Sequence, residues 1–173
     1  EITGGSSNIF TAQAGADAIT AAIREAADMP EIKAVVVRLN SPGGTPAAAQ
    51  EIDAELQRLK QAGKVVVASM GDVAASGAYW IAAGTDRIVA NPGTLTGSIG
   101  VLMQTTNLEE LYGKIGIDSE VFKSGPYKDM GSMNRAVTQE ERAIFQAMID
   151  DIYNQFVEVV ARGRHMEVDK VKA

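Results

Sequence analysis

The chain has 173 residues, with no cysteine, a single histidine and a formal net charge of −6 at pH 7. The missing cysteines exclude a thiol nucleophile, a disulfide framework and a Cys-ligated zinc site, and one histidine cannot build a multi-histidine metal centre. The acidic balance argues against a nucleic-acid partner, and no apolar run is long enough to span a membrane. Nucleophilic chemistry would therefore fall to Ser or Thr, and Lys becomes a candidate base.

The first half of the chain predicts a helix before residue 30 and then a strand–helix–strand unit. Residues 34–39 and 65–70 are nearly continuous β-branched runs, which are typical of fully buried parallel strands. Between them, Thr45 can cap a helix, Pro46 suits its first position, and Gly63 can end it in a left-handed turn. This pattern is a βαβ unit.

The second half predicts further strands at 87–90, 98–103 and 119–123, and a helix around 107–115. Thr138-Gln139-Glu140-Glu141 is a capping box that opens a long helix ending near Gly163. One apolar stripe follows this helix, made of Phe145, Met148, Ile149, Ile152, Phe156 and Val160. The fold class is therefore α/β with a mainly parallel sheet in a single domain.

The first candidate functional segment is the turn Asn40-Ser41-Pro42-Gly43-Gly44, between a predicted strand and a predicted helix. Pro42 fixes one backbone angle, and the glycines permit angles and close approaches that a Cβ would forbid. Backbone N–H groups at such a turn can stabilise a negatively charged oxygen. The same residues also fit an ordinary strand-to-helix turn.

The second segment covers residues 71–80, after the strand predicted at 65–70. Small residues on both sides of Ser76 leave its hydroxyl approachable, and the Gly77 amide can donate beside it if a helix begins there. The arrangement is similar in purpose to a nucleophile elbow, although it lacks the Gly-x-Ser-x-Gly spacing. Ser76 equally fits a simple helix N-cap.

The third segment, residues 122–131, is a Gly/Pro loop that holds Lys123 and Lys128. A lysine base must be neutral when it acts. Because the ordinary lysine pKa is near 10.4, neutrality at pH 7 costs about 4.6 kcal/mol and requires burial. The residues alone do not choose between the two lysines, and both also fit solvated loop cations.

Taken together, these segments resemble the signal peptide peptidase A family, Ser-Lys membrane proteases related to the ClpP/crotonase superfamily. Asn40-Ser41-Pro42-Gly43-Gly44 resembles the family's oxyanion loop, and Met70-Gly71-Asp72-Val73-Ala74-Ala75-Ser76-Gly77 resembles its nucleophile segment. Residues 95–101 and 124–129 resemble its third and fourth signatures. The resemblance covers most of the chain and implies a ClpP/crotonase-like fold of repeated β-β-α and βαβ units.

The resemblance also implies a role for each matching residue. Ser76 would be the nucleophile and Lys128 the general base, while Ser98 would orient the lysine amine. The backbone amides of Gly43 and Gly77 would form the oxyanion hole. The implied reaction is hydrolysis of signal peptides and similar apolar peptides, released in the membrane, through an acyl-enzyme and without a metal or cofactor.

The family has a short form with one protease domain, and residues 1–173 resemble that form. We expect the chain to lack the family's N-terminal membrane anchor and its C-terminal extension. The resemblance implies a ring-like homo-oligomer in which neighbouring protomers supply the serine and the lysine of each site. It further implies attachment to the cell membrane through the anchor, with the catalytic domain on the extracytoplasmic side.

Two alternatives remain open. A crotonase-type acyl-CoA enzyme would need a carboxylate base near the oxyanion hole and a site for the CoA phosphates, and a scaffold member of the fold would not be catalytic. A ClpP-type protease would need a histidine shortly after the serine, and the sequence has none there. The single histidine, His165, lies in a polar C-terminal stretch and is expected at the surface.

Overall fold

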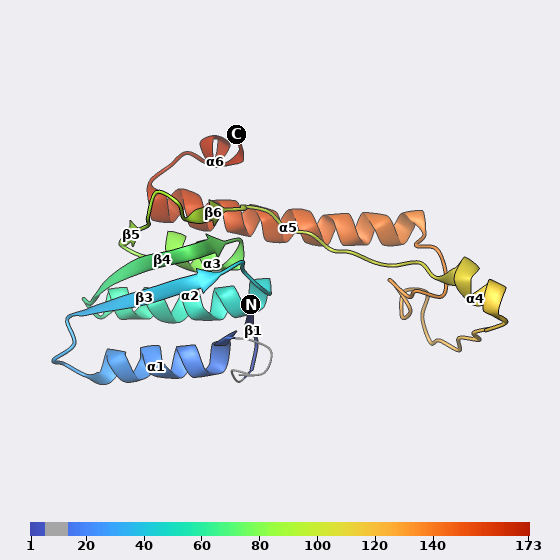
Figure 1. Ribbon diagram of the computed structural model, residues 1–173, viewed down its shortest axis with the longest axis horizontal. Coiled ribbons are helices and arrows are strands. Elements are labelled where there is room, and N and C mark those ends of the chain that lie inside the picture. The colour runs from blue at the N-terminus through green and yellow to red at the C-terminus, as the bar shows by residue number, and fades with distance from the viewer. Residues whose placement is uncertain (6–13) are drawn as a thin grey trace. The chain divides into compact units, whose positions relative to one another are not determined.

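The computed structural model describes residues 1–5 and 14–173 (Figure 1). Contacts divide the chain into two compact units: unit 1 comprises Glu1–Gly100 and Tyr153–Ala173, and unit 2 comprises Val101–Ile152. The described helices are α1 (Ala16–Asp28), α2 (Pro46–Gln61), α3 (Gly77–Ala83), α4 (Glu109–Ile115), α5 (Gln139–Arg164) and α6 (Val168–Lys172). The described strands are β1 (Ile2–Thr3), β2 (Ala14–Gly15), β3 (Ala34–Ser41), β4 (Val65–Ala75), β5 (Arg87–Val89) and β6 (Leu95–Gly97).

Unit 1 is built around a parallel sheet in which β4 is central. β4 pairs with β3, β5 and β6, always in parallel register. Helices α2 and α3 pack against this sheet, and α1 packs on α2 (Figure 1). The mainly parallel sheet and the βαβ unit predicted from the sequence are thus confirmed.

The expectation that the first two strands are fully buried is wrong. Val36 and Val65 face the side of the sheet opposite α2 and are exposed, Val36 to 65%. Leu39 and Val66, on the helix side, are buried. The helices described here cover one face of the strands, so burial alternates along β3 instead of running through it.

The end signals of α2 and α5 explain where these helices begin. Pro46 is the first residue of α2, Thr45 holds the N-cap position without a capping side-chain bond, and Gly63 adopts a φ of +80° just past the end. At α5, the Thr138 Oγ1 accepts the N–H of Glu141 at 3.2 Å, and a Glu141 carboxylate oxygen accepts the N–H of Thr138 at 3.0 Å. The predicted capping box is therefore confirmed.

Helix α5 ends at Arg164, one residue after Gly163, which confirms the end predicted near Gly163. A Cβ at Gly163 would collide with the carbonyl of Ala83, so this glycine permits close packing of α5 on the end of α3. The rings of Trp80 and Phe156, with centroids 4.9 Å apart, extend the same contact. The second half of α5 thus fixes the helix that follows Ser76.

Two predicted strands do not form. The expected strand at 98–103 is replaced by β6 at Leu95–Gly97, and residues 119–123 of unit 2 form no strand. The helix predicted around 107–115 is confirmed as α4, which ends at Gly116 with a φ of +75°. Both failed predictions fall on apolar runs that find no neighbouring strand in the described structure. Their large side chains stay exposed, Leu102 to 85% and Phe122 to 87%.

Candidate active site

Two turns meet at the ends of β3 and β4. The turn after β3 contains Gly43, and the turn after β4 contains Ser76 and Gly77. A Cβ built on Gly43 would lie 2.7 Å from the Cβ of Ser76 and 2.8 Å from the backbone N of Gly77. Gly43 also has a φ of +116°. Only glycine satisfies both the angle and the contact, so the predicted oxyanion turn and nucleophile segment adjoin.

A bulge in β4 produces this arrangement. The register runs from Leu39 opposite Met70 to Ser41 opposite Ala74, so β4 carries extra residues where it passes the end of β3. The Oδ1 of Asn40 accepts the N–H of Val73 at 3.1 Å and satisfies part of the bulged backbone. The sequence predicted that this strand covers residues 65–70, but β4 continues through the bulge to Ala75.

Ser76 has a strained backbone, with φ 51° and ψ −124°. Its N–H donates to the carbonyl of Gly97 at 2.9 Å, and its own carbonyl accepts the N–H of Trp80 at 2.9 Å. Ser76 stands at the N-cap position of α3, but its side chain makes no capping hydrogen bond. Strain of this kind is concentrated at functional sites, and it distinguishes the half-buried Ser76 from an ordinary N-cap, whose backbone is extended.

Backbone amides converge beside Ser76. The Gly43 N–H donates to the Oγ of Ser41 at 3.2 Å. In the part of the chain that the structure describes, the N–H groups of Gly44 and Gly77 have no acceptor, and a Cβ on Gly77 would lie 3.3 Å from the Gly44 nitrogen. Sequence reasoning named Gly43 and overlooked Gly44, although the Gly43-Gly44 pair itself was the available signal.

Ser98 directly follows Gly97, whose carbonyl accepts the N–H of Ser76. The β4–β6 register places Ala75 opposite Gly97, and Ser98 comes next with a φ of +53°. Its side chain is exposed. The structure therefore gathers Ser76, Ser98, Gly43 and Gly77 within unit 1.

Lys128 belongs to unit 2, where it lies in a series of tight turns. The N–H of Lys128 donates to the carbonyl of Gly125 at 3.3 Å, and the N–H of Met130 donates to that of Tyr127 at 3.2 Å. The Lys128 side chain is exposed in the single chain. It makes no ion pair or hydrogen bond with any residue described.

The other lysine of this loop, Lys123, is engaged. Its Nζ contacts the Asp129 carboxylate at 2.7 Å and donates to the carbonyl of Pro126 at 3.2 Å. An amine held by a carboxylate and a carbonyl is less available to a serine hydroxyl than an amine without such partners. Of the two lysines that the sequence left open, the contacts favour Lys128.

His165 is exposed and follows the last residue of α5, with a φ of +53°. This position agrees with the surface role expected from the sequence. In the described structure, none of the four unit 1 residues named above forms a hydrogen bond with His165.

Comparison with known proteins identifies the family of this chain. The model of the family described as "Peptidase family S49" matches residues 58–173 of the chain. This range includes Ser76, Ser98 and Lys128. The chain belongs to peptidase family S49. This is the family of the SppA-type serine proteases, whose fold is ClpP/crotonase-like, in agreement with the α/β class and parallel sheet.

Three relatives illustrate the similarity. A protein of Synechocystis sp. (strain PCC 6803), whose name describes it as a protease, is 52% identical over 139 residues. Protease 4 of Salmonella typhi is 41% identical over 160 residues, and the chloroplastic serine protease SPPA of Arabidopsis thaliana is 38% identical over 151 residues. The matches cover 80%, 91% and 87% of this chain but 50%, 26% and 22% of those proteins. The chain thus spans half or less of their length.

Among the residues that the structure describes, no helix combines the length and the apolar character needed to cross a membrane.

Proposed function

We propose that this S49 chain hydrolyses peptide bonds with Ser76 as nucleophile and Lys128 as general base. The observation that carries the proposal is the strained backbone of Ser76, held beside the amides of Gly77 and the Gly43-Gly44 turn. In the described structure the Lys128 amine has no hydrogen-bond or ion-pair partner, in contrast to Lys123, and this supports the choice of base.

The proposed reaction proceeds through an acyl-enzyme. Neutral Lys128 accepts the hydroxyl proton of Ser76 while the serine Oγ bonds to the peptide carbonyl carbon. The lysine then gives this proton to the leaving amine as the C–N bond breaks. In deacylation Lys128 takes a proton from water, the resulting hydroxide attacks the ester, and the proton returns to the Ser76 oxygen.

The amides beside Ser76 would bind the oxyanion, with roughly 3 kcal/mol expected from each donor. The Gly77 N–H is unengaged in the described structure and is one proposed donor. Gly43 would become the second if the Ser41 hydroxyl rotated away from its N–H. The Gly44 amide needs no such rearrangement, which makes it an alternative second donor.

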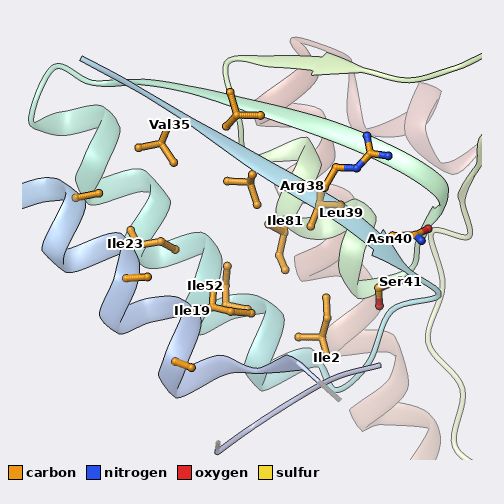
Figure 2. Close-up of a pocket in the computed structure, with 15 residues that line it drawn as sticks. Ile2, Ile19, Ile23, Val35, Arg38, Leu39, Asn40, Ser41, Ile52 and Ile81 are labelled. Carbon is orange, nitrogen blue, oxygen red and sulfur yellow. The ribbon is translucent and has the colours of Figure 1, made fainter. Parts of the chain in front are cut away.

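Apolar substrates are supported by a pocket of about 500 Å³ between α1, α2 and β3 (Figure 2). Ile19, Ile23 and Val35 line it, and Asn40 and Ser41 close the end from which the glycine turn begins. We propose that this pocket accepts an apolar side chain of the peptide. Peptides with Leu or Phe near the cleaved bond should therefore be cut faster than matched peptides with Lys or Glu, and equal rates would contradict this assignment.

Lys128 is exposed in the single chain, yet a lysine base needs a dry environment. We propose that assembly of several chains supplies that environment and that each site combines Ser76 of one protomer with the partner's Lys128.

The family's signal-peptide substrates would be met at a membrane, so the proposal includes membrane association and an extracytoplasmic location. Separating cell membranes from soluble fractions, and protease accessibility of intact cells, would test the location.

The decisive experiment measures covalent labelling of Ser76 by a fluorophosphonate, together with peptide cleavage. Ser76→Ala should abolish both, and Lys128→Ala should reduce both by at least about 1,000-fold, while Lys114→Ala, an exposed lysine of the same unit, should leave both unchanged. Full activity of either site variant would end the proposal. Acyl-CoA binding without labelling would favour the crotonase-type alternative. If the chain shows neither labelling nor acyl-CoA binding, the scaffold alternative would be favoured.

Mixing the two inactive variants tests whether sites are shared. Co-assembly of Ser76→Ala with Lys128→Ala should restore part of the cleavage, because some interfaces then combine an intact serine with an intact lysine. A mixed assembly that forms but stays inactive would show that both residues act within one protomer.

A further inference from the structure

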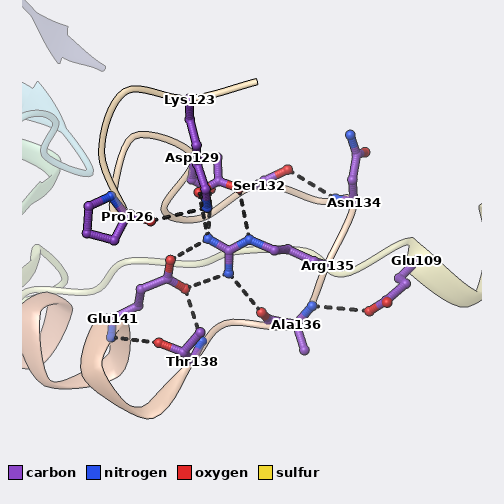
Figure 3. A network of polar contacts seen from close by, with 10 residues as sticks. All are labelled: Glu109, Lys123, Pro126, Asp129, Ser132, Asn134, Arg135, Ala136, Thr138 and Glu141. Carbon is purple, nitrogen blue, oxygen red and sulfur yellow. Dashed lines mark hydrogen bonds and ion pairs between the residues drawn. The ribbon is translucent and has the colours of Figure 1, made fainter. Parts of the chain in front are cut away.

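The turn that carries Lys128 is tied to the beginning of α5 by a network of charged side chains (Figure 3). Its centre is Arg135, whose Nε donates to one Asp129 oxygen at 3.0 Å and whose Nη2 donates to the other at 2.8 Å. The remaining guanidinium donors contact both oxygens of Glu141, one of them at 2.9 Å, and the carbonyl of Ala136 at 3.1 Å. Arg135 thus binds two carboxylates bidentately, which is the strongest geometry for such pairs.

The two carboxylates belong to structurally different places. Asp129 follows Lys128 directly in the tight turns, and Lys123 also contacts it. Glu141 is 1% exposed and closes the capping box of a 26-residue helix, so it is anchored. Arg135 therefore connects a loop, held otherwise by a few turn hydrogen bonds, to a rigid element within unit 2.

We propose that Arg135 is a positioning residue for the Ser-Lys reaction, which holds the Lys128 turn in one place by joining Asp129 to the first turn of α5. This inference rests on the proposed function, since it gives Arg135 a catalytic consequence only if Lys128 is the base. Arg135 itself would not touch the substrate.

The network has a second, electrostatic consequence. Arg135 and Lys123 neutralise the Asp129 carboxylate, and their hydrogen bonds hold its pKa well below the usual range. Without Arg135, the Asp129 carboxylate, which directly follows Lys128 in the sequence, would keep only Lys123 as a charged partner. A nearby negative charge favours the ammonium form of lysine, so the neutral base would appear only at higher pH.

The test compares four variants of the 173-residue chain by kcat, KM and the pH dependence of Ser76 acylation. Arg135→Gln should lower kcat about 100-fold with little change in KM, because a displacement of about 1 Å of a catalytic group has this order of effect. It should also move the acylation profile to higher pH. Arg135→Lys, which keeps the charge but not the forked geometry, should restore the profile but only part of kcat.

Asp129→Asn separates the two effects. It weakens the link to Arg135 and should lower kcat, but it leaves no carboxylate beside Lys128 and should not move the profile to higher pH. Arg142→Gln is the matched control, because this exposed arginine of α5 makes no side-chain contact with the network; it should behave as wild type.

Circular dichroism at the assay temperature establishes that each variant is folded. If Arg135→Gln is not folded, Arg135→Gln with Glu141→Gln replaces it, since this pair leaves no buried carboxylate without its partner. The inference is overturned if Lys128→Ala is inactive but a folded variant without Arg135 keeps the wild-type kcat and pH profile. If Lys128→Ala is itself active, the proposed function fails first, and the two failures are thus distinct.

Discussion

Gly43 lies so close to Ser76 that a Cβ on the glycine would stand 2.7 Å from the Cβ of the serine. The glycine turn after β3 therefore determines the space around Ser76 as directly as the strand that carries the serine does. Any side chain at position 43 must displace Ser76, the Gly77 amide or the turn itself.

Gly43→Ala should destabilise the chain and abolish Ser76 labelling. Its φ of +116° is costly for alanine, and the new methyl group would overlap Ser76, so we expect a loss of about 2–4 kcal/mol in the free energy of unfolding. Urea unfolding measures the loss. Gly93→Ala is the control, because it has open space around it and no positive φ; an equal loss there would refute the steric explanation.

Ser76→Gly should be more stable than Ser76→Ala, although both variants lose the nucleophile. Glycine easily adopts the backbone angles of Ser76, so the folded state of Ser76→Gly gains about 1–3 kcal/mol from relief of strain. The greater freedom of glycine in the unfolded chain offsets roughly 0.4–1 kcal/mol of this gain. We expect a net difference of about 1 kcal/mol in thermal or urea unfolding. Equal stability of the two variants would mean that the serine is not strained in solution.

Ser98→Ala should lower the rate of Ser76 acylation by about 5–10-fold, which corresponds to one ordinary hydrogen bond. The proposed role of its hydroxyl is to orient the Lys128 amine, so the loss should appear in the acylation rate. Because the side chain is exposed, the free energy of unfolding should change little. Unchanged acylation kinetics would remove Ser98 from the site.

Acid should destabilise unit 2 through Glu141. Hydrogen bonds from Arg135 lower the pKa of this carboxyl to about 2, against a usual value of 4.5. A lowered pKa means that the stabilisation is complete above pH 4.5 and disappears as the pH falls toward 2. The melting temperature should fall over this window, and in Glu141→Gln the fall should be smaller.

Glu110→Gln removes an exposed carboxylate from α4 and serves as the control for the acid experiment. It should keep the wild-type dependence of the melting temperature on pH. If Glu141→Gln shows the same dependence as wild type, the Arg135–Glu141 pair does not contribute to acid sensitivity.

Local end signals and hydrophobic periodicity were sufficient to predict much of the fold. Pro46 and Gly63 mark the two ends of α2, and the Thr138–Glu141 pair marks the beginning of α5, because caps depend on residues that are adjacent in sequence. The runs that became β3 and β4 were also recognised. Their one-sided burial was not, since it depends on which neighbours cover each face.

Features set by distant neighbours escaped prediction. The strain at Ser76 depends on the pairing of β4 with β6, and the short β6 at Leu95–Gly97 has too little periodicity to reveal itself. The apolar run around Phe122 predicted a strand, but a strand needs a partner, which periodicity cannot supply.

The candidate site was predicted mainly through the family resemblance, since composition and spacing alone left both lysines open. The resemblance chose Lys128, and the contacts support that choice, because Lys123 is paired with Asp129 and Lys128 is not. The ion-pair network around Arg135 had no signal in the sequence: Asp129, Arg135 and Glu141 are evenly spaced, but only the folded loop brings their side chains together.

The glycine at position 163 has a mechanical consequence for the backbone of Ser76. Helix α3 is only seven residues long, and its far end is pressed against the backbone of α5 where Gly163 meets Ala83. At its near end, Ser76 is fastened to Gly97. Because α3 is held at both ends, it cannot shift to relieve the strained backbone of Ser76, so the folded chain retains this strain.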